Sequence, residues 1–132
     1  MALILVAEDE DDIRAVVVRI LLRAGHEVID AADAAVALHD VRERHPDAVI
    51  SDLDMPGMSG VELCQAIRAC ADTADLPVIF VSGTLLPGDH RAADARATAL
   101  LSKPFLSRDL VDCLDKALTA GHHDGLPPMT CP

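Results

Sequence analysis

Short runs of apolar residues alternate along this chain with longer stretches in which apolar residues recur every three or four positions. Each short run is rich in Ala, Val, Ile or Leu and is bounded by polar or turn-forming residues, a pattern that predicts buried strands. The predicted strands cover residues 2–7, 27–31, 48–51, 78–82 and 98–102.

Helical spacing follows each of these runs. Asp12, Asp33 and Ser107 are positioned to cap the first, second and last helices, and Ser59 with Glu62 has the spacing of a capping box before the third. The stretch 89–97 contains Ala and Arg but no large apolar residue, so only helix propensity favours a helix there. The predicted helices cover about 13–24, 34–44, 60–71, 89–97 and 108–118.

Five strand–helix alternations in sequence imply a parallel sheet with helices on both faces. We therefore predict an α/β fold, a flavodoxin-like doubly wound (βα)5 sandwich whose five-stranded sheet has the order 2-1-3-4-5. Residues 1–120 form the single predicted domain, and the Gly- and Pro-containing segment 121–132 is predicted to be a disordered tail.

Composition removes several classes of function. Hydrophobic residues make up 51% of the 132 residues, which excludes a disordered chain. Aromatic residues are only 2%, with no Trp or Tyr, so the chain cannot build a base-stacking platform or an aromatic flavin site. The net charge of -11 argues against direct binding to nucleic acid or an anionic membrane. The apolar run at the N-terminus is too short for a signal peptide or a membrane span.

The cysteines indicate a reducing compartment. They are scattered, with no CxxC motif, so we expect four reduced thiols that pack as small apolar side chains in a cytoplasmic protein. A metal site built from His122, His123 and Cys131 is a weaker alternative, because their spacing is irregular. The four cysteines are Cys64, Cys70, Cys113 and Cys131.

Chemically active groups follow or end four of the predicted strands. In the predicted order, Asp9 after the first strand and Asp52 after the third face each other at the switch point of the sheet, where like charges require a cation. Mg²⁺, a hard ion that prefers oxygen ligands, meets this requirement. Lys103 adds an ammonium and Ser82 a hydroxyl, and this set suits a phosphoryl group transferred to Asp52 as the nucleophile.

With these residues in place, the sequence resembles the receiver domains of bacterial response regulators, the phosphoacceptors of two-component systems. The resemblance covers about residues 3–118 and rests on four blocks in the family's order and spacing. These are Ile4-Leu5-Val6-Ala7-Glu8-Asp9-Glu10, Asp52-x-x-Met55-Pro56-Gly57-Met58-x-Gly60, Val78-Ile79-Phe80-Val81-Ser82-Gly83 and Lys103-Pro104-Phe105.

The resemblance implies a role for each site residue. Asp52 would take a phosphoryl group from a histidine kinase or phosphotransfer protein, and Ser82 and Lys103 would hold that group. Asp9 and Asp52 would bind Mg²⁺ directly, Asp54 through its backbone carbonyl, and Glu8 through water. The Lys103–Pro104 bond would be cis. Such a protein is not an enzyme beyond its own phosphorylation and dephosphorylation, and it switches a surface that binds a downstream effector protein.

Two features depart from the family. Receivers have Tyr or Phe three residues before the lysine, whereas this chain has Leu100, which cannot hydrogen-bond. The stretch 89–97 is polar and rich in Ala, and the spacing from Ser82 to Lys103 is about one residue short. The output or dimer face formed by the fourth helix, the fifth strand and the fifth helix is therefore expected to be altered.

Three other classes compete with a receiver. Asp52-Leu53-Asp54 after an apolar strand also resembles the first motif of haloacid-dehalogenase-type Mg²⁺ phosphatases, with Asp52 as nucleophile, but there the acidic pair comes late in the chain. A flavodoxin-like cofactor binder would need a phosphate loop where Glu8 and Asp9 stand. A pseudo-receiver would keep the fold without being phosphorylated, which the intact acidic residues and Lys103 argue against.

Overall fold

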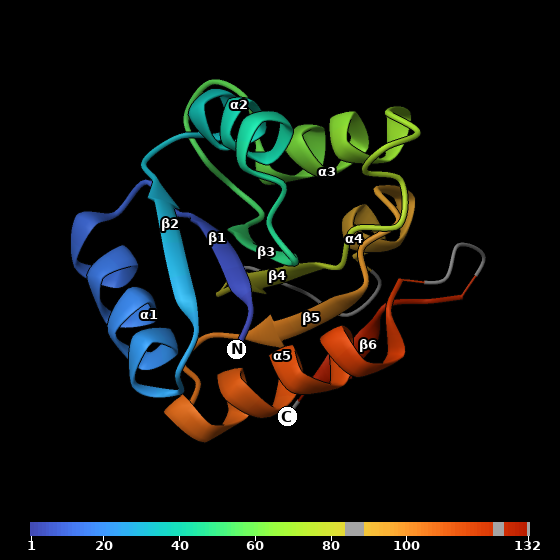
Figure 1. Cartoon of the computed structure of the whole chain (residues 1–132). Coiled ribbons are helices and arrows are strands. Elements are labelled where there is room, and N and C mark those ends of the chain that lie inside the picture. The colour runs from blue at the N-terminus through green and yellow to red at the C-terminus, as the bar shows by residue number, and fades with distance from the viewer. Residues whose placement is uncertain (84–88, 123–125, 132) are drawn as a thin grey trace.

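A computed structural model describes residues 1–83, 89–122 and 126–131 of the chain. One parallel sheet lies between two layers of helices (Figure 1). The strands are β1 (Leu3–Ala7), β2 (Glu27–Ala31), β3 (Ala48–Asp52), β4 (Val78–Ser82), β5 (Ala99–Ser102) and β6 (Met129–Cys131). The helices are α1 (Asp11–Arg23), α2 (Ala34–Arg44), α3 (Gly60–Ala69), α4 (Arg91–Asp94) and α5 (Ser107–Ala120).

The sheet has the order β2-β1-β3-β4-β5-β6, so the predicted order of the first five strands is confirmed. Every neighbouring pair is parallel, and the carboxyl ends of the strands therefore meet at one edge of the sheet. The chain crosses from one side of β1 to the other between β2 and β3, which makes the carboxyl ends of β1 and β3 the switch point.

Aliphatic side chains fill both faces of the sheet. Helices α2, α3 and α4 cover one face, and α1 and α5 cover the other (Figure 1). Phe80 on β4 is a fully buried aromatic residue, and its neighbours in the core are Ala, Val, Leu, Ile, Met and Cys. None of the described helices is long and apolar enough to cross a bilayer.

Helix ends agree with the predicted caps at two places and differ at the others. Asp33 accepts a hydrogen bond from the Val36 amide, and Ser59 with Glu62 forms the predicted capping box. Asp12 and Ser107 are not caps, because each helix begins earlier, after Glu10 before α1 and after Leu106 before α5.

The fourth helix is shorter than the predicted 89–97 and spans only Arg91–Asp94. Its sequence offers no large apolar residue, so only the small side chains of Ala92, Ala95 and Ala97 pack in the core. Asp89 precedes the helix and accepts a hydrogen bond from the Arg91 amide at 2.9 Å.

The end of the chain contradicts two predictions. The tail is not disordered throughout, because Met129–Cys131 forms β6 beside β5. The four cysteines are not all thiols, because Cys113 on α5 is bonded to Cys131 on β6, while Cys64 and Cys70 take no part in a disulfide. The sequence pattern misses this strand because it has three residues and no apolar run, and the cross-link that anchors it joins cysteines 18 residues apart.

This arrangement also removes the metal site considered for the tail. Cys131 is part of the disulfide and offers no thiolate, and His122 Nδ1 forms a hydrogen bond with Thr98, so the predicted set of three ligands does not form. His123 lies outside the described residues.

Candidate functional site

The predicted site residues converge at the carboxyl edge of the sheet. Glu8 and Asp9 follow β1, and Asp52 is the last residue of β3. Oxygen atoms of these three carboxylates lie within 4.8 Å of one another. Parallel pairing of β1 with β3 produces this cluster. Ala7 and Ser51 are partners in the register, and the acids come directly after them on the two strands.

Lys103 reaches the same cluster from the end of β5. Its Nζ donates to Glu8 Oε1 at 3.1 Å and to Asp52 Oδ2 at 3.4 Å. The Lys103–Pro104 peptide bond is cis, as predicted from the resemblance. Ser82 is buried at the end of β4, one position beyond Val81, which pairs with Asp52. The structure thus brings together Glu8, Asp9, Asp52 and Lys103, with Ser82 on the intervening strand.

Burial shapes the electrostatics of this cluster. Glu8 is only 4% exposed, and burial together with the neighbouring Asp52 raises its pKa to about 7, against the opposing effect of Lys103. Burial lowers the pKa of Lys103, but its hydrogen bond to Glu8 and the charge of Asp52 outweigh that, so its pKa is raised overall. Lys103 is therefore held as a cation beside carboxylates that repel one another.

The cluster also fits a divalent cation. Glu8 Oε2 is buried and has no hydrogen-bond partner among the described residues, so one carboxyl oxygen still lacks a donor or cation. The three acidic residues offer only oxygen ligands, which Mg²⁺ prefers, and one ammonium cannot balance three carboxylates. The chemistry of the cluster is therefore compatible with Mg²⁺, and the assignment of Glu8, Asp9 and Asp52 as its ligands stays a prediction.

The backbone and the side chain of Asp54 make contacts with different partners. Its backbone amide donates to Asp52 Oδ1 at 3.4 Å, which helps to orient that carboxylate. Its side chain turns to Arg91, whose Nη1 lies 2.7 Å from Asp54 Oδ1 and whose Nη2 lies 2.9 Å from Asp89 Oδ2. The predicted role of the Asp54 backbone carbonyl as a metal ligand stays a prediction.

Arg14 supports the site, and the sequence pattern did not single it out. From α1 its guanidinium donates to the Glu8 carbonyl at 2.8 Å, to Asp11 at 2.6 Å and to Asp30 at 3.2 Å. It therefore ties the turn that carries Glu8 to both α1 and β2. The only signal in the sequence is a basic residue three positions after an acidic one, which any solvated helix could show.

The sequence motif includes Gly60 but does not explain why a glycine is needed there. The structure gives the reason, because an ideal Cβ on residue 60 would lie 1.8 Å from the Asp52 carbonyl oxygen. The start of α3 therefore packs directly against the backbone of the central aspartate, and the Gly60 amide donates to the Leu53 carbonyl at 2.9 Å.

Comparisons with known proteins point to one family. The profile of the response regulator receiver domain matches residues 4–115. The chain is 36% identical to the response regulator receiver protein CpdR of Brucella abortus over 121 residues, which cover 91% of this chain and 99% of CpdR. Other relatives are longer proteins, of which this chain matches less than half. The match covers 16% of the sensory/regulatory protein RpfC of Xanthomonas campestris and 46% of the transcriptional regulatory protein PrrA of Mycobacterium bovis.

Solved structures agree with the sequence relatives. The chemotaxis protein CheY4 of Vibrio cholerae superposes with a TM-score of 0.83 at 32% identity, over 88% of this chain and 98% of that one. The receiver domain of the sensor histidine kinase PA1611 from Pseudomonas aeruginosa superposes with a TM-score of 0.84 at 26% identity, over 89% of this chain and 98% of that one. That structure has a magnesium ion coordinated in its active site cleft. The phosphatase alternative finds no support among these matches. The chain belongs to the response regulator receiver domains of two-component systems.

Proposed function

We propose that Asp52 accepts a phosphoryl group from a histidine kinase or phosphotransfer protein in a Mg²⁺-dependent reaction. The observation that carries this proposal is the cluster of Glu8, Asp9 and Asp52 with Lys103 bonded to two of its members. Asp9 and Asp52 would bind the metal directly, with the backbone carbonyl of Asp54, and Glu8 through water. When bound, Mg²⁺ supplies the positive charge that an anionic phosphodonor needs beside three carboxylates.

In the proposed reaction, a carboxylate oxygen of Asp52 attacks the phosphorus atom of a phosphohistidine. The new O–P bond gives an aspartyl phosphate as the N–P bond breaks and the imidazole leaves. Lys103 Nζ lies 3.4 Å from Asp52 Oδ2, close enough to form an ion pair with an oxygen of the phosphoryl group once that group is bound to Asp52. The Ser82 hydroxyl donates to the same group, and the Asp54 amide keeps the Asp52 carboxylate in place. Hydrolysis of the aspartyl phosphate by water returns the chain to its starting state.

A groove beside the site supports a docking place for the phosphodonor. It has a volume of about 360 Å³ and includes Ile13, Val16 and Ile20 of α1, together with Lys103 and Phe105. Val16 is 49% exposed, so its apolar side chain is accessible to a partner at this groove. Because Lys103 lines this groove and contacts Asp52, a helix of the phosphodonor placed here would bring its histidine next to the carboxylate. A Val16→Lys substitution should slow transfer from a phosphohistidine domain and leave acetyl phosphate as good a donor as before.

We further propose that the signal leaves through β5, which connects Lys103 with α4 and α5. Leu100 stands at the family's aromatic position and packs, partly buried, against the core on the face of the sheet covered by α2, α3 and α4. Without an aromatic hydroxyl or ring to rotate, the response would pass through the position of β5 itself. A downstream effector protein, or a second copy bound through the α4–β5–α5 face, would read this change in the cytoplasm.

The test is the mass of the intact protein after incubation with Mg²⁺ and acetyl phosphate. The wild-type chain should gain one phosphoryl group, Asp52→Asn should gain none, and Asp54→Asn should still gain one, as a matched control two residues away. After the donor is removed, the added mass should decay with time. Turnover of phosphate monoesters without a mass gain would identify a phosphatase, and neither gain nor turnover would identify a pseudo-receiver.

A further inference from the structure

The Cys113–Cys131 bond joins the last described strand of the sheet to α5. The two Cα atoms lie 5.8 Å apart, within the usual range for a disulfide, and the bond closes a segment of 18 residues. Cys113 is 1% exposed and Cys131 is 7% exposed. Both pack in the core between the sheet and the layer of α1 and α5, near Leu101 of β5.

Little else holds β6 against β5. The strand pairs three residues, Met129, Thr130 and Cys131, with Ala99, Leu100 and Leu101. The Met129 amide donates to the Thr98 carbonyl at 3.0 Å. Cys131 is the buried side chain of the strand, Met129 is only half-buried, and Leu126 just ahead of it is 65% exposed. A three-residue strand with one buried side chain cannot offset the conformational entropy lost when it is ordered, so the cross-link decides whether it stays paired.

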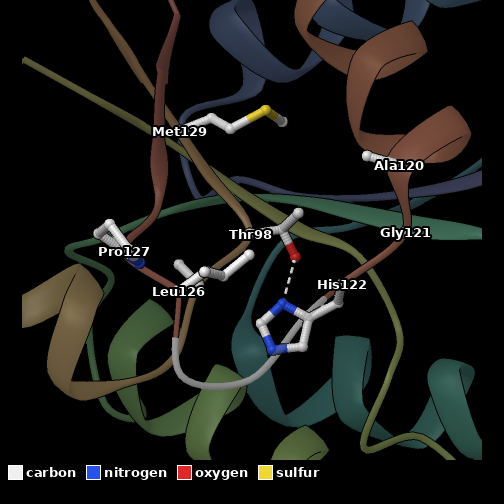
Figure 2. Close-up of a pocket in the computed structure, with 8 residues that line it drawn as sticks. Thr98, Ala120, Gly121, His122, Leu126, Pro127 and Met129 are labelled. Carbon is white, nitrogen blue, oxygen red and sulfur yellow. Dashed lines mark hydrogen bonds between the residues drawn. The ribbon is translucent and has the colours of Figure 1, made fainter.

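The segment just after α5 has an independent anchor. Thr98 Oγ1 accepts a hydrogen bond from the Val78 amide at 3.0 Å and shares a second hydrogen bond with His122 Nδ1 at 2.9 Å. Figure 2 shows this bond next to Leu126, Pro127 and Met129, which line a cavity of about 100 Å³ together with Thr98 and His122. Loss of the disulfide would therefore free β6 while His122 stays in place.

We propose that Cys113 and Cys131 form a thiol–disulfide switch that controls whether β6 covers the edge of β5. The thiolate of a dithiol reductant attacks the sulfur of Cys131, the more exposed of the two residues, and the Cys113 thiolate leaves and takes up a proton. The second thiol of the reductant then displaces Cys131, which also takes up a proton. The reductant loses two electrons and becomes a disulfide, and an oxidising disulfide reverses the reaction.

The switch acts on the strand that ends at the phosphoryl site. β5 runs directly into Lys103, and its outer edge is paired with β6 in the disulfide form. In the cytoplasm, the location proposed above, a disulfide is usually transient and redox-sensing rather than structural. The dithiol form would leave the β5 edge open for pairing and would loosen the strand through which we expect the signal to pass.

Dithiothreitol is the reagent that tests this switch on the native, folded chain of 132 residues. Iodoacetamide should label Cys70 and, slowly, Cys64 in the oxidised protein, and also Cys113 and Cys131 after reduction. Hydrogen exchange of the peptide containing β5 should rise at least about tenfold on reduction, while that of β3 should stay constant. Cys131→Ser should show the fast β5 exchange without dithiothreitol, and Cys70→Ser should behave as wild type.

Each other outcome overturns the switch. A bond that resists dithiothreitol until the protein unfolds is structural, and β5 exchange that does not change on reduction means that β6 stays paired without the cross-link. Labelling of all four cysteines before reduction means that the bond does not form. These readouts do not involve Asp52, so their failure leaves the proposed phosphorylation untouched, and failure of phosphorylation leaves them interpretable.

Discussion

Replacing Gly60 by Ala tests how closely α3 must approach β3, the strand that ends in Asp52, the proposed phosphoacceptor. Gly60 is the first residue of α3, and an ideal Cβ there would lie 1.8 Å from the Asp52 carbonyl oxygen and 3.0 Å from Ser51 Oγ. A carbon–oxygen contact needs about 3.3 Å, so α3 and the end of β3 would have to separate by roughly 1.5 Å. The group that obstructs the new methyl is backbone, and no side-chain rotation can relieve the overlap.

Two effects of opposite sign determine the stability of Gly60→Ala. Alanine in a helix is favoured over glycine by about 1 kcal/mol, whereas overpacking against a rigid neighbour costs about 3 kcal/mol. The variant should therefore lose about 2 kcal/mol of unfolding free energy, measured by urea denaturation. A displacement of this size at the reacting carboxylate should also slow phosphorylation by acetyl phosphate about 100-fold.

Gly57→Ala is the matched control. Gly57 has φ +74°, and its ideal Cβ would meet no described atom within 4 Å. The change should cost about 1 kcal/mol through the left-handed backbone conformation and leave the phosphorylation rate unchanged. If Gly60→Ala proved as stable as wild type or more stable, helix propensity would outweigh the contact, and the inferred rigidity of the α3–β3 junction would be wrong.

Three further predictions concern residues that support the site or the sheet. Arg14→Ala should weaken Mg²⁺ binding about 10- to 100-fold by calorimetry, because it frees the turn that carries Glu8, whereas Arg19→Ala on the same helix should not. The pKa of Glu8, raised from 4.5 to about 7, means that the metal-free folded state binds a proton between these values that the unfolded chain does not. The stability of the metal-free protein should therefore fall as pH rises from about 4.5 to about 7. Glu8→Gln should flatten this dependence, measured by thermal unfolding at several pH values. A steeper fall in the variant would contradict the inferred proton on Glu8. Thr98→Val should cost about 2 kcal/mol, because a buried amide and the His122 ring lose their partner, and Thr98→Ser should restore most of it.

The sequence predicts the parts of this molecule that depend on local periodicity. Buried parallel strands are continuous apolar runs and their helices have apolar faces, so β1, β3 and β4 could be placed to within a residue. Their order followed from the resemblance and from the rules of doubly wound sheets. The acids of the site were found because residues at strand ends converge at one edge, whatever the details of packing.

What the sequence did not predict depends on contacts between distant residues. β6 has only three residues and is cross-linked to α5 by a bond between Cys113 and Cys131, and no apolar pattern in the sequence predicts either feature. Arg14 looks like any solvated helix residue until the fold brings the Glu8 carbonyl to it. The sequence overpredicts α4. Residues 89–97 have helix propensity, but only Arg91–Asp94 is helical, because few of the side chains there can be buried.

The bond between Lys103 and Glu8 has a consequence for the order of folding. These residues are separated by 95 positions in the sequence, and Lys103 and Asp52 by 51. Loops of this length close late, so an intermediate that contains only β1, β2 and β3 would have the three carboxylates without the ammonium. Such an intermediate would hold mutually repelling charges at its exposed edge, and docking of β5 would relieve them. Competence to accept phosphate would then arise only in the last cooperative step, and a partly synthesised chain could not give a false signal.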